Sequence, residues 1–303
     1  MLAILVAVVA LCETGLAQPG QTFQFFISAV DATGAPVMDL QPEDVVMTED
    51  GVRQQVVRVE PHPVPMKLTI AVDNSPDSAE AVVHYRSGLQ GLIEALPPGV
   101  EVTLISTSPQ PRTVLRPTTD RAQILRAVTG FSPEQGRPRF TDALVEWSKR
   151  LESEARDRKM TPYVPVMVAI STTAPEQSSY QPSEVTKAAN FLVGRRARFN
   201  VIVTSTRTGQ ATSADTVNAS VQAIIGIPIA KATNGRYESL AASSRLATLL
   251  PEWGKDLAML HTRQANQVRV TVERKNSGQL QNPRIELARQ GLDGVVTIDG
   301  FLP

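Results

Sequence analysis

Residues 66–78 read MKLTIAVDNSPDS, and the rest of the fold is built around this stretch. A short apolar run, Leu68–Val72, ends abruptly in the polar side chains of Asp73, Ser75 and Asp77. A run this short, bounded by prolines, is typical of a buried strand. In an open α/β sheet, ligands bind beyond the carboxyl ends of the strands, where the strand order reverses. The sequence therefore directs the search for function to this loop.

Strands and helices alternate along the chain after this stretch. Buried strands are expected at 102–105, 165–170, 199–203 and 236–240, with a short edge strand at 113–116. Helices are expected at 78–96, from 120 onwards, and at 142–158, 183–195, 217–225 and 243–264. Such alternation predicts an α/β domain with a doubly wound, mostly parallel sheet that is covered by helices on both faces.

The two ends of the chain carry strand signals instead. Near the amino end, Asp50-Gly51 indicates a hairpin between the apolar runs Val45–Met47 and Val56–Val59, because a type I′ turn needs positive φ at both central residues. Near the carboxyl end, strands are expected at 268–272, 285–287 and 295–298. Neither block has enough strands to be stable alone. We therefore expect one small β-sandwich built from both chain ends, with the α/β domain inserted into it.

This organisation predicts four segments. They are a signal peptide (1–17), the first part of the β-sandwich (18–62), the α/β domain (63–264) and the second part of the β-sandwich (265–303).

The charge balance limits the classes of partner. Thirty basic residues offset thirty acidic ones in a chain of 303 residues, so the formal net charge is zero. Nucleic acids and anionic membranes attract a basic excess, which this chain lacks. Aromatic residues, at 5%, are too few to form a base-stacking surface. We expect a protein partner of unknown identity and no nucleic acid.

Met1–Ala17 is typical of a secretory signal peptide. Its apolar run, Leu2–Leu11, is too short to span a bilayer, and small residues precede the expected cleavage after Ala17. Export to the periplasm, cell envelope or exterior follows, with no membrane span left after cleavage. Cys12, the only cysteine, would be removed with this segment, which excludes disulfides and thiol catalysis. Lipid attachment at Cys12 is the alternative.

The ordered set of motifs resembles the von Willebrand factor A family, and in particular its secreted bacterial members with a β module on each side. Those motifs are the block VDATGAPVMDLQPEDVVMTEDGVRQQVV, the Asp142-Ala143-Leu144 helix start and the ending IDGFLP. The resemblance implies a protein-binding or adhesion module without enzymatic activity. In that family, binding uses a metal-ion-dependent adhesion site. One loop supplies Asp-x-Ser-x-Ser, a second supplies Thr and a third supplies Asp.

The match to that metal site is incomplete. Asp73 and Ser75 match, and Asp77 stands in place of the second Ser. The Thr position falls on Pro138, which has no side-chain oxygen, and Thr172 stands in place of the distal Asp. Two carboxylates can hold Mg²⁺ or Mn²⁺ only weakly, with several waters. The candidate ligand-binding loop therefore comprises Asp73, Ser75, Asp77 and Thr172, with weak metal binding at most. The alternative is that the acidic and hydroxyl side chains only cap the following helix.

Two further functions stay open. A structural or assembly protein of the cell envelope could use the A domain as a scaffold. A hydrolase could use Asp73 and Asp77 as a carboxylate pair, although no second catalytic constellation accompanies them. His62, His84 and His261 are not at metal-ligand spacing, and no nucleophile elbow or phosphate-binding loop is found, so no catalytic residue is predicted.

Overall fold

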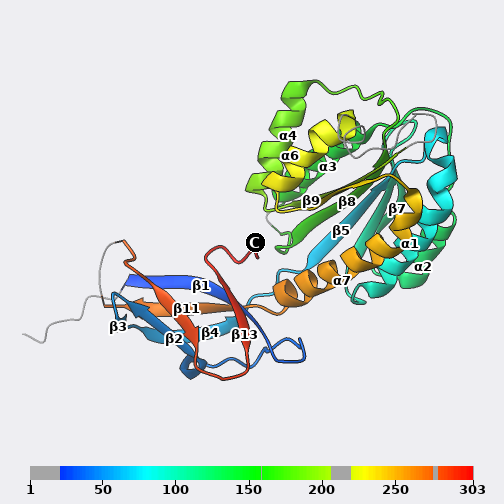
Figure 1. Ribbon diagram of the computed structural model, residues 1–303. Coiled ribbons are helices and arrows are strands. Elements are labelled where there is room, and N and C mark those ends of the chain that lie inside the picture. The colour runs from blue at the N-terminus through cyan, green and yellow to red at the C-terminus, as the bar shows by residue number, and fades with distance from the viewer. Residues whose placement is uncertain (1–20, 158, 206–219, 276–278, 303) are drawn as a thin grey trace, which may run out of the picture.

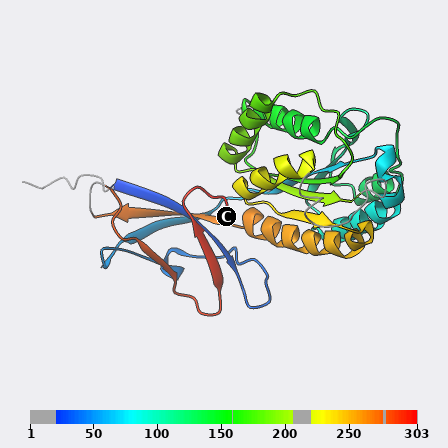
Figure 2. The same ribbon diagram turned by 45° about the horizontal axis from the view of Figure 1, so that its top comes forward.

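The computed structural model describes residues 21–157, 159–205, 220–275 and 279–302 (Figure 1). The expected signal peptide, with Cys12, lies outside the described residues. Within them, no helix is both long enough and apolar enough to cross a membrane. The chain forms an α/β domain and a β domain, which lie next to each other in both ribbon views (Figures 1 and 2).

A six-stranded sheet forms the centre of the α/β domain, with the strand order β10-β9-β8-β5-β6-β7. All neighbouring pairs are parallel except β6 and β7, so β7 is an antiparallel edge strand. The strands are β5 (Met66–Val72), β6 (Glu101–Ser106), β7 (Arg112–Thr118), β8 (Val164–Thr172), β9 (Arg198–Thr204) and β10 (Tyr237–Leu240). The sheet confirms the predicted fold class. It also shows why β5 and β8 are continuous apolar runs, since both lie in the interior of a sheet covered on both faces.

Two layers of helices cover this sheet (Figure 1). One core packs α1, α2 and α7 against one face, and a second core packs α3, α4 and α6 against the other. The helices are α1 (Val82–Ala95), α2 (Arg121–Thr129), α3 (Phe140–Ala155), α4 (Pro182–Gly194), α6 (Val221–Ala232) and α7 (Leu246–Ala265). Single 3-10 segments precede some elements: η1 (Pro42–Asp44), η2 (Pro76–Ala81) and η3 (Ser243–Arg245). Helical spacing accounts for the buried faces, as in α1, where Tyr85, Leu89 and Leu92 are fully buried.

Strands from both chain ends alternate within the β domain. Its two antiparallel sheets have the orders β13-β1-β11-β4 and β12-β2-β3. The strands are β1 (Gln21–Val30), β2 (Val45–Glu49), β3 (Val52–Arg53), β4 (Gln55–Pro61), β11 (Val268–Arg274), β12 (Arg284–Leu287) and β13 (Asp293–Thr297). One core joins the sheets, with Phe25, Met47 and Val270 fully buried in it. The prediction that both ends build one β unit is confirmed, because β1 pairs with β11 and β13.

Two predicted elements differ from the structure. Asp50 and Gly51 do form the hairpin turn with positive φ, but the second arm is Val52–Arg53. The run Val56–Val59 belongs to β4, which pairs with β11 in the other sheet. The turn depends on Asp50 and Gly51 alone, so local sequence predicts it. The pairing partner of β4 is about 200 residues away in sequence, and no local pattern indicates it.

Of the helix predicted at 217–225, residues 217–219 lie outside the described residues, and α6 runs beyond the predicted end at Ile225, to Ala232. Gly226 and Pro228 are poor helix formers, which argued for an earlier end. The helix continues because Ile229 and Ala230 are buried, Ile229 within the core beneath α3, α4 and α6.

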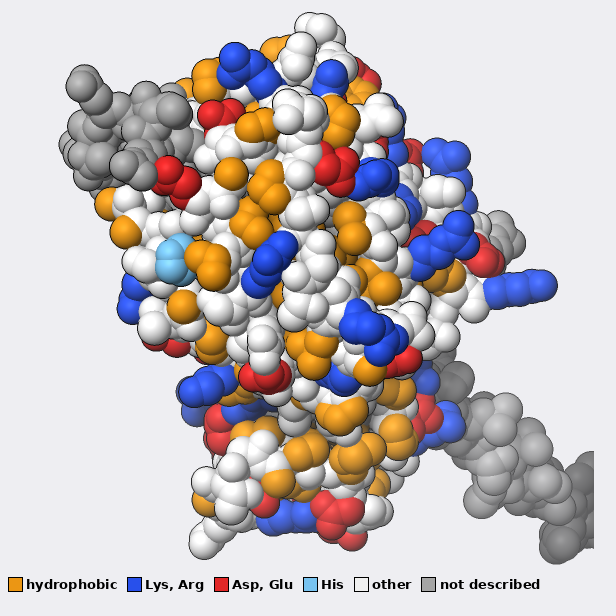
Figure 3. Space-filling view, turned by 90° about the vertical axis from the view of Figure 1, so that its right-hand side faces the viewer, with side chains coloured by type: hydrophobic (Ala, Val, Ile, Leu, Met, Phe, Trp, Pro, Cys, Tyr) orange, Lys and Arg blue, Asp and Glu red, His pale blue; other side chains and the backbone are white. Residues whose placement is uncertain are grey.

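The molecular surface mixes charges of both signs. On the face seen in Figure 3, basic and acidic side chains lie side by side, with hydrophobic side chains scattered between them. A mixed surface of this kind has no extended basic field to attract a polyanion.

Candidate functional site

The strand order reverses between β5 and β8. From β5 the chain passes through α1 to β6 on one side, and it later returns through α3 to β8 on the other side. Asp73 directly follows β5, and Thr172 ends β8. The Thr172 hydroxyl donates a hydrogen bond of 2.6 Å to the Asp73 carboxylate, and the Asp73 amide donates to the Ile170 carbonyl at 2.8 Å. Two of the predicted residues therefore meet at the position where α/β folds bind ligands.

The Asp73 carboxylate is fully buried and its oxygens are already engaged. Besides the Thr172 hydroxyl, it accepts a hydrogen bond from the Ser75 amide at 2.8 Å and from the Thr172 amide at 3.2 Å. Burial raises the pKa of Asp73, and the hydrogen bonds from Thr172 and Ser75 oppose that rise. Tyr85 of α1 is close enough for the Asp73 charge to raise its pKa, after the larger effect of burial. Both oxygens of the Asp73 carboxylate therefore accept hydrogen bonds within the protein, and the group is not exposed to bind a ligand directly.

Ser75 differs from Asp73 because its hydroxyl makes no well-aligned hydrogen bond with the described residues, although it lies close enough to the Asp73 carboxylate to lower the pKa of that group. Ser75 occupies the position before η2 without capping it through its side chain, and its carbonyl accepts from Ser78 instead. Other buried polar side-chain atoms at the ends of β5, β6 and β8 also have no hydrogen-bond partner among the residues that the structure describes: Asn74 Nδ2, Ser106 Oγ, Thr107 Oγ1, Ser108 Oγ and Ser171 Oγ. Buried polar groups normally find a partner. This edge is therefore rich in neutral groups that can bind ordered water or a ligand.

Asp77 and Pro138 complete the predicted set. Asp77 lies in η2, is half-buried and takes part in no hydrogen bond or ion pair with the described residues. Pro138 is buried, and its carbonyl accepts from the Gln177 amide at 3.0 Å. The capping alternative gains no support here, since neither Ser75 nor Asp77 caps η2 through a side-chain hydrogen bond.

The side chains at these positions do not fit the five-ligand metal site that the resemblance implies. The Thr172 hydroxyl donates to Asp73, Pro138 offers no side-chain oxygen, and the Asp73 oxygens accept internal hydrogen bonds. Mg²⁺ requires a compact octahedron of oxygens at about 2.0–2.1 Å. In the described part of the chain, no group of three or more His, Cys, Asp or Glu side chains could hold a metal ion.

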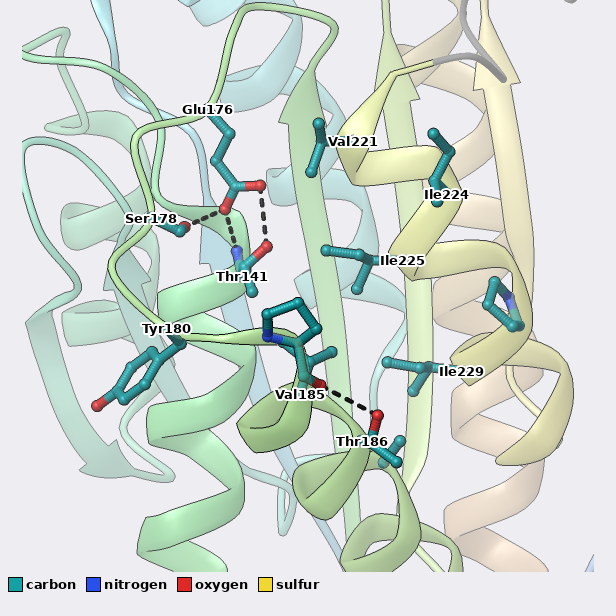
Figure 4. A pocket seen from close by; sticks show the side chains of 13 residues that line it. Thr141, Glu176, Ser178, Tyr180, Val185, Thr186, Val221, Ile224, Ile225 and Ile229 are labelled. Carbon is teal, nitrogen blue, oxygen red and sulfur yellow. Dashed lines mark hydrogen bonds between the residues drawn. The ribbon is translucent and has the colours of Figure 1, made fainter.

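A second polar cluster lies beside a cavity between α4 and α6, and the sequence did not predict it (Figure 4). Glu176, in the loop between β8 and α4, accepts hydrogen bonds from the amide and hydroxyl of Thr141 and from the Ser178 hydroxyl. The cavity measures about 570 Å³. Its walls are mostly apolar and include Val185 and Ile225. The sequence feature that could have indicated this cavity is that α6 is apolar on all sides. A helix of that kind exposes some apolar side chains, and Ile224 is 61% exposed.

The comparison with protein families identifies the central part of the chain. Residues 68–170 match the family model of the von Willebrand factor type A domain. The matched segment runs from β5 through β8 and contains Asp73, Ser75 and Pro138. The predicted resemblance is thereby confirmed at the level of the domain. The comparison with curated proteins returns no match.

The similar solved structures have low sequence identity to this chain and TM-scores below 0.5. The conserved hypothetical protein BatB from Bacteroides thetaiotaomicron is 14% identical, with a TM-score of 0.46, covering 64% of this chain and 98% of that one. A von Willebrand factor type A protein from Catenulispora acidiphila is 11% identical, with a TM-score of 0.49, covering 93% and 75%. The manganese-loaded TRAP protein from Plasmodium vivax is 18% identical, with a TM-score of 0.45, covering 81% and 98%.

Proposed function

We propose that this protein is an exported, non-enzymatic binding module that recognises a protein partner through the carboxyl edge of its A domain without a tightly bound metal. The match to the von Willebrand factor type A domain supports the binding role, since such domains commonly mediate protein binding. The hydrogen bonds of the Asp73 carboxylate support binding without a metal. Its oxygens accept hydrogen bonds from Thr172 and Ser75, so the loop is already held in place without a cation.

Site-specific photo-crosslinking from the native cell envelope tests the binding role. A crosslinker at Pro76, which is exposed beside the loop, should capture the same partner with Mg²⁺ as with a chelator. A crosslinker at the exposed Gln24 of the β domain is the matched control, and it should not capture that protein. A partner captured at Pro76 only with Mg²⁺ or Mn²⁺ would contradict metal independence. Capture from both positions, or from neither, would favour the scaffold role.

Calorimetric titration of the purified mature protein with Mg²⁺ and Mn²⁺ tests for metal binding directly. We expect no binding, or binding with a dissociation constant of about 1 mM or weaker, which corresponds to about 4 kcal/mol. Such binding adds little stability when the ion concentration is near the dissociation constant. Micromolar, one-to-one binding that disappears in Asp73→Ala would restore the metal-dependent adhesion site.

The hydrolase alternative is less favoured because Asp73 is fully buried and shares no hydrogen-bond partner with Asp77. Loss of a hydrolytic activity in Asp73→Ala, with the fold retained, would support that alternative. Export rests on Met1–Ala17. Fractionation and amino-terminal sequencing should find the mature protein outside the cytoplasm and beginning at Gln18, whereas a lipid-modified Cys12 would show anchoring.

A further inference from the structure

The cavity between α4 and α6 has the properties of a binding site for a small molecule. Its volume of about 570 Å³ falls within the range typical of ligand pockets, about 300–1,000 Å³. Apolar side chains of α4 and α6 form most of its walls: Val185, Ala189, Val221, Ile224, Ile225 and Ile229. Glu176, Thr141 and Ser178 form a polar cluster at one end, whereas the hydroxyl of Thr186 at the other end already donates to the Pro182 carbonyl (Figure 4). An apolar body with one polar head therefore suits the cavity.

The polar end is held rigidly by hydrogen bonds. Glu176 Oε1 accepts from the Thr141 amide and from the Ser178 hydroxyl, and Oε2 accepts from the Thr141 hydroxyl at 2.9 Å. The Ser178 hydroxyl in turn accepts from the Asp142 amide at 3.2 Å. An ionised carboxylate offers about four acceptor positions. Three are used, so one position on Oε2 remains for a donor from a ligand.

The negative charge of Glu176 at the polar end of the cavity favours a cationic ligand. Glu176 forms no ion pair with any residue in the described part of the chain. The nearby Asp142 is also acidic, and its own partner is Arg139, at 2.9 Å. The amino end of α3 stabilises the Glu176 charge in part, through the Thr141 amide. Glu176 is half-buried, and a carboxylate that is partly removed from water is stabilised by a cationic partner, which an ammonium group at Oε2 would supply.

We propose that the α4–α6 cavity binds a small organic cation, with an ammonium group hydrogen-bonded to Glu176 Oε2 and an apolar body against Val185 and Ile225. A free molecule is favoured over a protein segment because the cavity is of small-molecule size. The site uses none of Asp73, Ser75, Asp77 and Thr172. It is therefore independent of the binding role proposed above, and the two can fail separately.

The test uses the purified mature protein and 4-phenylbutylammonium as the probe, with the uncharged 4-phenylbutanol as its matched analogue. Calorimetry or NMR titration should show saturable one-to-one binding of the amine. Glu176→Gln keeps the size of the side chain and can keep all three hydrogen bonds, because its amide can donate to the Thr141 hydroxyl. It should weaken binding of the amine at least tenfold and leave binding of the alcohol unchanged.

Two further variants locate the site. Ala189→Phe places a ring in the cavity and should abolish binding of both probes. Glu252→Gln removes a carboxylate from an exposed position on α7, and binding of the amine should not change. Equal binding of the amine by the wild type and by Glu176→Gln would overturn the proposal. It would equally be overturned if a capped lysine peptide bound at the cavity while the amine did not.

Discussion

The two helical layers of the α/β domain are built differently. On one face, α1 and α7 pack so closely that a Cβ on Gly88 would lie 2.5 Å from the Leu246 carbonyl oxygen. On the other face, α4 and α6 leave a cavity of about 570 Å³, with Ile224 61% exposed. The same sheet thus supports one closed layer and one open layer. The closed layer contributes stability, whereas the open layer retains apolar surface that a ligand can bury.

Truncating a side chain in the closed layer should have the largest effect. Leu250 is fully buried on α7 next to α1. Leu250→Ala should lower the free energy of unfolding by about 2–5 kcal/mol, because it removes buried methyl groups and leaves a cavity. Urea denaturation followed by circular dichroism measures this loss. A loss below about 1 kcal/mol would mean that α1 and α7 repack easily and that the layer is not closed.

A pair of glycine substitutions compares the two layers directly. A Cβ on Gly254 of α7 would lie 2.7 Å from the Leu92 carbonyl oxygen, whereas one on Gly194 of α4 would have no neighbour within 4 Å. Gly254→Ala should destabilise the protein by about 1–3 kcal/mol through overpacking. Gly194→Ala should stabilise it by up to about 1 kcal/mol through helix propensity. Thermal unfolding of both variants gives the comparison, and equal shifts would contradict the difference between the layers.

The pH dependence of stability tests the charge in the open layer. Burial raises the pKa of Glu176 above its ordinary value of 4.5 in the folded protein. The folded state therefore holds this proton more tightly than the unfolded state. Protonated Glu176 therefore contributes to the free energy of unfolding. This contribution is complete below pH 4.5 and is lost as the pH rises through the folded-state pKa.

Glu176→Gln should remove this part of the pH dependence. The buried Asp73 acts with the same sign, so only the difference between wild type and variant isolates Glu176. Melting temperatures of both proteins between about pH 4 and pH 8 should therefore converge at the acidic end, with the variant relatively more stable at the alkaline end. Parallel curves would show that Glu176 has the same pKa in both states.

The smallest effect is expected at the exposed rim of the cavity. Ile224→Ala should change the free energy of unfolding by no more than about 0.5 kcal/mol, because the side chain is mostly in solvent. Denaturation under the conditions used for Leu250→Ala gives a direct comparison. A loss similar to that of Leu250→Ala would show that α6 is covered in solution.

Much of the fold followed from local patterns. The apolar runs of β5 and β8, the Asp-Gly hairpin turn and the start of α2 near residue 120 were all readable along the chain. Each depends on residues within a few positions of one another, where periodicity and turn chemistry act. The second arm of the hairpin and the end of α6 were predicted wrongly. For the hairpin, the pairing of β4 with the distant strand β11 overrode the local signal, and for α6 it was the burial of Ile229 in the core.

The sequence by itself determined which side chains could act at the carboxyl edge: Asp73 and Ser75 are present, and Pro138 and Thr172 stand where metal ligands would be expected. Only the tertiary structure decided what these side chains do. It placed Thr172 against Asp73, about 100 residues apart in sequence, so that the carboxylate is satisfied within the protein. It likewise brought Glu176 to Thr141 at the polar end of an apolar cavity. Side-chain chemistry is fixed residue by residue, whereas hydrogen-bond partners and burial depend on how the strands and helices pack.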